Sequence, residues 1–215
     1  MSVEKLEQCI TTADLDALDA LLAQDPALAK TRTSHQVSPL MLSCYYKKPE
    51  VADLLLKYLD EIDLFEAAAA GRFDVVANLV YSHPDAVDAY AEDGFTPLGL
   101  ACYFGHYEIA QYLVLKGADV NKPSNNGFTV YPLHSAAAGN YTQIARMLIE
   151  NNAAVNVKQQ AGATALHSAA QNGNIDLLIF LLEHGADVTI RMEGGKVAAD
   201  LAREKGFMEI AQALE

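Results

Sequence analysis

The stretch from residue 96 to residue 121, TPLGLACYFGHYEIAQYLVLKGADVN, decides the fold because parts of it return along the chain. Its opening phrase returns as PLHSAA at residues 132–137 and as TALHSAA at residues 164–170. Its closing phrase, GADV, returns at residues 185–188. A sequence motif that recurs about every 33 residues is typical of repeat architectures, in which each unit contributes one part of a continuous core.

Each repeat has the residue order of two helices joined by a turn. Thr96 can cap the first helix by accepting a backbone N–H, and Pro97 suits the first helical position. Gly105 suits the left-handed residue that ends this helix. A second helix with apolar residues at helical spacing follows and ends at Gly117. Residues 119–127 then predict an outward turn of the β-hairpin type.

This text and its period resemble the ankyrin repeat. The resemblance implies an all-α ankyrin-repeat solenoid of about seven helix-turn-helix units with short β-hairpin fingers, in one domain over residues 1–215. The expected units are 1–33, 34–60, 61–91, 92–124, 125–159, 160–192 and 193–215. One residue of the first helix anchors each unit, and these anchors are Leu6, Leu40, Leu64, Leu98, Leu133, Leu166 and Ala199.

Two irregularities interrupt this pattern. The step from Leu40 to Leu64 is 24 residues, whereas the other steps are 33 to 35, so no full finger is expected before Leu64. Either the solenoid is continuous with one finger missing, or two arrays join with a kink near residue 60. The segment 128–132 is two residues longer than its counterpart, and Tyr131 is a poor helix cap, so this finger should be reshaped.

Composition limits the classes of protein to which the chain can belong. No apolar run reaches about 18 residues, so no membrane span is expected. The first residues lack the pattern of a signal peptide, which favours a cytoplasmic location. The chain has only three cysteines, Cys9, Cys44 and Cys102, and an odd number cannot all pair, so no disulfide framework is expected. They occupy positions that need small side chains, and we expect them to be buried free thiols.

Familiar catalytic motifs are absent from the sequence, which has no P-loop, GxSxG, HExxH or CxxC pattern. His134 and His167 each follow an anchor leucine, where the resemblance implies a structural histidine that bonds across repeats. No cofactor and no metal are therefore expected, and the chain is not expected to be an enzyme. An enzyme with an unrecognised site is the least favoured alternative.

The resemblance also implies that partners bind on the hairpin tips and on the concave face of the first helices. The positions five and six residues after each anchor bring two aromatic pairs beside a pair of alanines. Aromatic rings at such positions supply a large contact area at low entropy cost. Alternatively, some of the rings turn inward against the second helices. The expected partner-binding residues are Tyr45, Tyr46, Ala69, Ala70, Phe95, Tyr103, Phe104, Phe128, Tyr131, Glu92 and Asp93.

Charge is concentrated in the middle of the chain. Residues 60–93 carry nine acidic residues and one basic residue, which is −8 of the formal net charge of −13. This excess either solvates one face or steers a basic partner toward the chain. It disfavours nucleic acid, because phosphates need Lys and Arg.

These features predict a non-catalytic protein–protein interaction scaffold that binds a protein or peptide, with a basic partner favoured. The chain is expected to be a monomer. A more specific alternative is an inhibitor or immunity-type protein that blocks a basic enzyme.

Overall fold

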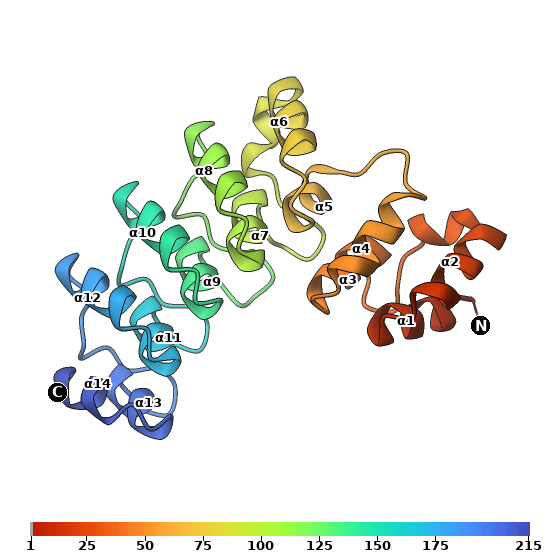
Figure 1. Ribbon diagram of the computed structural model, residues 1–215. Coiled ribbons are helices and arrows are strands. Elements are labelled where there is room, and N and C mark those ends of the chain that lie inside the picture. Colours follow the sequence, from red (N-terminus) through yellow and green to blue (C-terminus); the bar gives the residue numbers. More distant parts are fainter. Residues whose placement is uncertain (1) are drawn as a thin grey trace. The chain divides into compact units, whose positions relative to one another are not determined.

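The computed structural model describes residues 2–215, and this part of the chain contains fourteen α-helices, two short 3-10 helices and no strand (Figure 1). The α-helices follow one another as seven pairs, so the predicted all-α repeat fold is confirmed. In order, the elements are α1 (Ser2–Thr12), α2 (Leu15–Gln24), η1 (Pro26–Lys30), α3 (Pro39–Tyr45), α4 (Pro49–Leu56), α5 (Leu64–Ala69), α6 (Phe73–Ser82), η2 (Pro84–Asp88), α7 (Pro97–Phe104), α8 (Tyr107–Leu115), α9 (Pro132–Ala138), α10 (Thr142–Glu150), α11 (Ala165–Asn172), α12 (Ile175–Glu183), α13 (Ala198–Glu204) and α14 (Met208–Ala213).

Contacts group the chain into two compact units, Met1–Leu79 and Val80–Glu215. In the C-terminal unit, the first helices α7, α9, α11 and α13 pack one against the next, and the second helices α8, α10 and α12 form a parallel row (Figure 1). In the N-terminal unit, α1 packs on α3, α3 on α5, and α2 on α4. This boundary at residues 79 and 80 differs from the possible junction of two arrays near residue 60, which remains a prediction.

The repeat register read from the sequence places the core. All seven anchor residues are buried, and none is more than 6% exposed. Each lies on a first helix, and within each unit consecutive first helices pack against one another. Full burial of one leucine side chain contributes about 1.5–3 kcal/mol, so the spacing of the anchors largely determines the stack.

The first helices begin and end where local chemistry requires. Thr96 Oγ1 accepts a hydrogen bond from the Gly99 N–H at 3.0 Å, and Pro97 occupies the first turn of α7. The helix ends at Gly105, whose φ of 83° lies in the left-handed region that favours glycine. These contacts satisfy backbone groups that the helix itself leaves unpaired.

The fingers are turns rather than β-hairpins. The short β-hairpins expected in the fingers are reduced to turns without strands, because a finger such as 91–95 is closed by only two backbone hydrogen bonds, from the Ala91 N–H to the Phe95 carbonyl at 2.8 Å and from the Gly94 N–H to the Ala91 carbonyl at 2.9 Å. Neighbouring fingers of the C-terminal unit also share one backbone hydrogen bond each. These bonds run from the Asn125 N–H to the Gly94 carbonyl at 2.9 Å, from the Gln160 N–H to the Phe128 carbonyl at 2.9 Å and from the Glu193 N–H to the Ala161 carbonyl at 2.8 Å.

The finger before α9 has the predicted extra length. In the other fingers a backbone N–H donates to the carbonyl four residues later, whereas here Ser124 donates to Val130, six residues later. The difference of two residues matches the insertion. Tyr131 caps α9 without a side-chain hydrogen bond, as expected of a poor cap. The four-residue turns are Thr33 to Val37, Ala91 to Phe95, Gln159 to Ala163 and Met192 to Lys196.

The expected finger gap before Leu64 is present in the structure. No backbone hydrogen bond closes a turn within residues 59–63, and this segment forms the connection from α4 to α5 (Figure 1). Asp63 then starts α5 with a capping box. Its Oδ1 accepts from the Glu66 N–H at 2.8 Å, and Glu66 Oε2 accepts from the Asp63 N–H at 3.0 Å.

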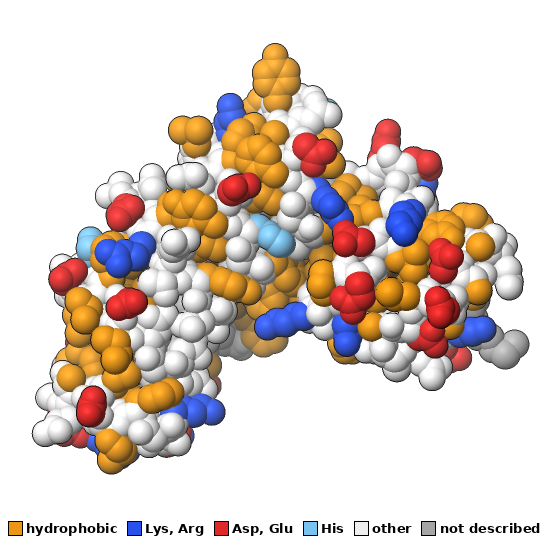
Figure 2. All heavy atoms as spheres, in the orientation of Figure 1, with side chains coloured by type: hydrophobic (Ala, Val, Ile, Leu, Met, Phe, Trp, Pro, Cys, Tyr) orange, Lys and Arg blue, Asp and Glu red, His pale blue; other side chains and the backbone are white. Residues whose placement is uncertain are grey.

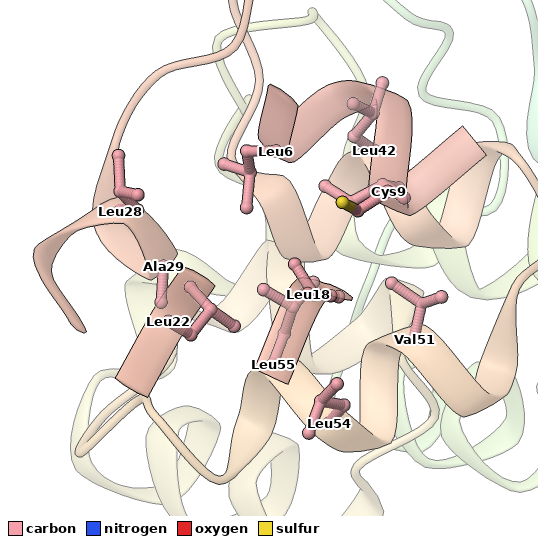
Figure 3. Close-up of a cluster of buried hydrophobic side chains, with 11 residues drawn as sticks. Leu6, Cys9, Leu18, Leu22, Leu28, Ala29, Leu42, Val51, Leu54 and Leu55 are labelled. Carbon is pink, nitrogen blue, oxygen red and sulfur yellow. The ribbon is translucent and has the colours of Figure 1, made fainter. Parts of the chain in front are cut away.

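The N-terminal unit has a core of aliphatic side chains from four α-helices and one 3-10 helix (Figure 3). Leu6 and Cys9 come from α1, and Leu18 and Leu22 come from α2. The side chains of α4 close the cluster from the other side. Its members are Leu6, Cys9, Ile10, Leu18, Leu22, Leu28, Ala29, Leu42, Val51, Leu54 and Leu55.

Candidate functional site

The three cysteines are buried free thiols, as the sequence indicated. Burial raises the pKa of the Cys44 thiol to about 12 and also raises the pKa values of Cys9 and Cys102. The thiolate is the nucleophile and the metal ligand, and burial disfavours it at each site. These side chains therefore act as small apolar groups between helices.

His134 and His167 lie in the core of the C-terminal unit and tie the start of each first helix to its surroundings. His134 Nδ1 accepts from the Tyr131 N–H at 3.2 Å, and His167 Nδ1 accepts from the Thr164 N–H at 3.2 Å. Burial lowers the pKa of His134 to about 4 and lowers that of His167. Among the described residues, no three His, Cys, Asp or Glu side chains are grouped so that they could hold a metal ion.

An aromatic cluster forms where the finger before α7 meets the end of that helix. We define it as Phe95, Tyr103 and Phe104. The ring centroids of Phe95 and Tyr103 are 6.2 Å apart, and those of Tyr103 and Phe104 are 5.0 Å apart in an edge-on arrangement. Tyr103 is 42% exposed, while the other two rings are half-buried. The half-buried rings hold the exposed one in place, which suits an anchor for a partner.

A finger hollow of about 400 Å³ lies on the same unit. Phe128 stands at its edge with 61% of its surface exposed. Sequence reasoning found Phe128 but missed the other residues, although the two-residue insertion in this finger was the available signal. The lining residues are Phe128, Val130, Gln159, Gln160, Ala161 and Glu193.

The other predicted binding residues have mixed exposure. Tyr46 is 44% exposed, Tyr45 is half-buried, and Tyr131 is half-buried with its ring 5.6 Å from that of His134. Of the four paired rings, Tyr46 and Tyr103 are therefore exposed. A binding role for each residue remains a prediction, and so does a single groove joining residues 45–104.

The alanine pair needs a correction. Ala69 was expected as part of an exposed floor, but it is only 2% exposed, and Ala70 is half-buried. The reason is that α5 packs against α3 and buries its alanines, since a methyl group allows helices to approach closely. Ala69 therefore contributes to packing within the N-terminal unit.

Several acidic side chains of residues 60–93 have structural partners. Asp88 Oδ1 accepts from the Asp119 N–H at 3.0 Å, and Asp93 Oδ1 accepts from the Phe95 N–H at 3.2 Å. Asp60 pairs with Lys30 at 3.1 Å. Asp85 and Glu92 are exposed. Some carboxylates of this segment thus stabilise turns, while others contribute charge to the surface.

A second apolar surface follows the second helices of the C-terminal unit, where hydrophobic side chains alternate with charged ones (Figure 2). Leu115 at the end of α8 is 80% exposed. Ile175, Ile179 and Leu182 are exposed at helical spacing on α12. Among the described residues, no helix combines the length and apolarity needed to cross a bilayer.

The sequence is similar to those of known proteins. The family model described as ankyrin repeats (3 copies) matches residues 64–124 and 120–192. The probable 26S proteasome regulatory subunit p28 of Saccharomyces cerevisiae is 27% identical over 163 residues, which is 74% of this chain and 60% of that protein. The RelA-associated inhibitor of Mus musculus is 38% identical over 104 residues, or 48% of this chain. Alpha-latrocrustotoxin-Lt1a of Latrodectus tredecimguttatus is 31% identical over 124 residues, or 54% of this chain.

The helix pairs, the buried anchors and the capping pattern define a helical repeat protein. The family match covers more than half of its length, so the chain belongs to the ankyrin-repeat family. Ankyrin repeats mediate protein–protein interactions and are generally non-catalytic. The chain spans only 12% of the mouse relative and 9% of the latrocrustotoxin, so the similarity covers a small part of each protein.

Proposed function

We propose that the chain is a non-catalytic adaptor whose C-terminal unit binds a protein or peptide through the aromatic cluster and the finger hollow. The observation that supports this proposal best is the exposed Tyr103 ring, which lies beside the half-buried Phe95 and Phe104 rings. An aromatic side chain held in this way loses little entropy on binding.

The partner is expected to combine apolar groups with positive charge. Glu92 and Asp93 precede Phe95 in the same finger, so carboxylates lie close in the chain to the aromatic cluster. Rim charges of this kind act mainly on the rate of association. The proposal includes a monomeric chain that meets its partner in the cytoplasm.

Site-specific photo-crosslinking tests this surface. Benzoyl-phenylalanine placed at Tyr103 or at Phe128 should crosslink the partner in cells that naturally contain the chain. The same group placed at Leu115, which is exposed on α8, is the matched control. Crosslinking that is strongest at Leu115 would contradict the proposed surface.

An inhibitor is the second candidate. The acidic excess favours it, and one relative matched over 104 residues is named an inhibitor. If the crosslinked partner is an enzyme, its activity should fall in proportion to complex formation. If the enzyme stays fully active in the saturated complex, the inhibitor function is contradicted and only the adaptor function remains.

A further inference from the structure

The N-terminal unit contains a cleft of about 700 Å³ that no residue of the predicted binding surface lines. It lies between α4, the connection of residues 57–63, and the first part of α6. We call it the α4–α6 cleft. All of its lining residues fall within residues 53–79, and therefore within one compact unit.

The cleft exists because the repeat spacing is broken here. Among the described residues, consecutive second helices pack side by side at three steps, α2 on α4, α8 on α10 and α10 on α12. Among the described residues, α4 and α6 have no packing contact of that extent. The finger that normally separates successive repeats is also missing before α5. The row of second helices thus has a gap that the chain does not fill.

The floor of the cleft is aliphatic. Its side chains come from α4, from the connection and from α6, and each is only half-buried. An apolar hollow that remains open to solvent is a typical binding site. The floor consists of Leu56, Leu59, Ile62, Val75 and Leu79.

The rim of the cleft is acidic. Four carboxylates line it, from Asp53, Asp60, Glu61 and Asp74, against the two basic side chains of Lys57 and Arg72, a net charge of −2. Arg72 pairs with Asp53, and Asp60 pairs with Lys30. Glu61 and Asp74 are exposed, so the rim favours a positively charged occupant.

We propose that the α4–α6 cleft binds a basic, amphipathic α-helix of a partner protein. A helix is about 10 Å wide and rises about 1.5 Å per residue, so about 700 Å³ corresponds to roughly six helical residues. Its apolar side would cover the aliphatic floor, and its Lys and Arg side chains would face Glu61 and Asp74. Such a helix takes the place of a second helix in the row. This site is independent of the aromatic cluster.

The test uses three fluorescent 14-residue peptides and the full chain. The first has leucines on one helical side and lysines elsewhere, the second replaces every lysine by glutamate, and the third has the first composition in an order without an apolar side. Fluorescence anisotropy gives the dissociation constant of each. We expect only the first peptide to bind, and hydrogen exchange to slow within residues 53–79.

Two variants and a matched control locate the peptide. The double substitution Glu61→Gln and Asp74→Asn should weaken binding about fivefold, because exposed ion pairs contribute about 0.2–1 kcal/mol each. Glu183→Gln with Glu209→Gln changes net charge equally at exposed sites in the other unit and should have no effect. Asn78→Trp fills the mouth of the cleft from an exposed position and should abolish binding.

Three results would overturn the proposal. One is equal binding of the peptide with and without an apolar side. Another is binding that Asn78→Trp leaves intact in a folded chain, as judged by circular dichroism. The third is a chain that is dimeric in sedimentation and becomes monomeric with Asn78→Trp, because a second copy would then occupy the cleft. Tyr103→Ala should leave peptide binding unchanged, which separates this test from that of the aromatic cluster.

Discussion

The Nε2 atom of His134 lies 3.1 Å from the backbone carbonyl oxygen of Val157, at the approach to the next finger. The other ring nitrogen accepts a hydrogen bond from the Tyr131 N–H. The two contacts together require a neutral ring with its proton on Nε2. One buried side chain thus joins the start of α9 to the following repeat.

This contact predicts a loss of stability in mild acid. The unfolded imidazole takes up a proton near pH 6.5, whereas burial keeps the folded ring neutral down to about pH 4. Between these values the unfolded state binds more protons, so the free energy of unfolding falls as the pH falls. The loss from His134 approaches about 3 kcal/mol, at about 1.4 kcal/mol per pH unit. Urea unfolding at pH 7, 5.5 and 4.5 measures it.

Two variants separate His134 from the carboxylates that titrate in the same experiment. His134→Gln should lower stability at pH 7 and flatten the dependence between pH 6.5 and 4. His35→Gln, at an exposed finger position, should change neither. His167 should act in the same direction as His134, because burial lowers its pKa too. An unchanged slope in His134→Gln would show that the ring is not the sensor.

Two finger glycines should respond differently to the same substitution. Gly94 and Gly127 have φ values of 82° and 85°, so alanine is strained about equally at both. A Cβ at Gly94 would lie 2.8 Å from the Asn126 backbone nitrogen, whereas nothing lies within 4 Å of a Cβ at Gly127. We expect Gly127→Ala to cost about 1 kcal/mol and Gly94→Ala clearly more. Thermal unfolding compares them, and equal losses would contradict the close approach of the fingers.

Removal of the exposed ring of the aromatic cluster should weaken partner binding. Tyr103→Ala is expected to cost about 2 kcal/mol, or about 30-fold in affinity, if this ring anchors the partner. Tyr81→Ala removes an equally large ring that is 80% exposed on α6 and serves as the control. Titration of the crosslinked partner, once identified, measures both. Equal losses in the two variants would remove the special role of Tyr103.

Neutralising the acidic surface should slow association. Replacing Asp85, Asp88 and Asp93 by Asn and Glu92 by Gln keeps oxygen acceptors for the Asp119 and Phe95 N–H groups. The stability change should therefore stay within about 0.5 kcal/mol per site. The on-rate should fall and lose its salt dependence, since exposed charges are screened beyond about 8 Å at physiological ionic strength. Stopped-flow mixing at 50 and 300 mM salt, about sixfold apart in ionic strength, tests this. If the variant associates as fast as the unmodified chain, electrostatic steering is contradicted and the acidic side chains serve solubility instead.

Local interactions explain which features could be predicted from the sequence. The capping of α7 by Thr96 and its end at Gly105 depend on backbone groups within one turn of the residue. The anchor spacing, the missing finger and the lengthened finger follow from counting residues between equivalent positions. The fingers expected as short β-hairpins are present as turns without strands, because a four-residue turn leaves no room for a ladder of hydrogen bonds.

By itself, the sequence determined the family, the seven helix pairs and the identity of the buried anchors, because these depend on periodic contacts that every repeat makes in the same way. Only the tertiary structure decided which side chains are exposed. Ala69 is buried because α5 packs on α3, and Tyr103 is exposed although it lies beside two half-buried rings. The α4–α6 cleft also had to be seen in three dimensions, because a short spacing shows that a finger is missing and not whether the neighbouring helices close the space.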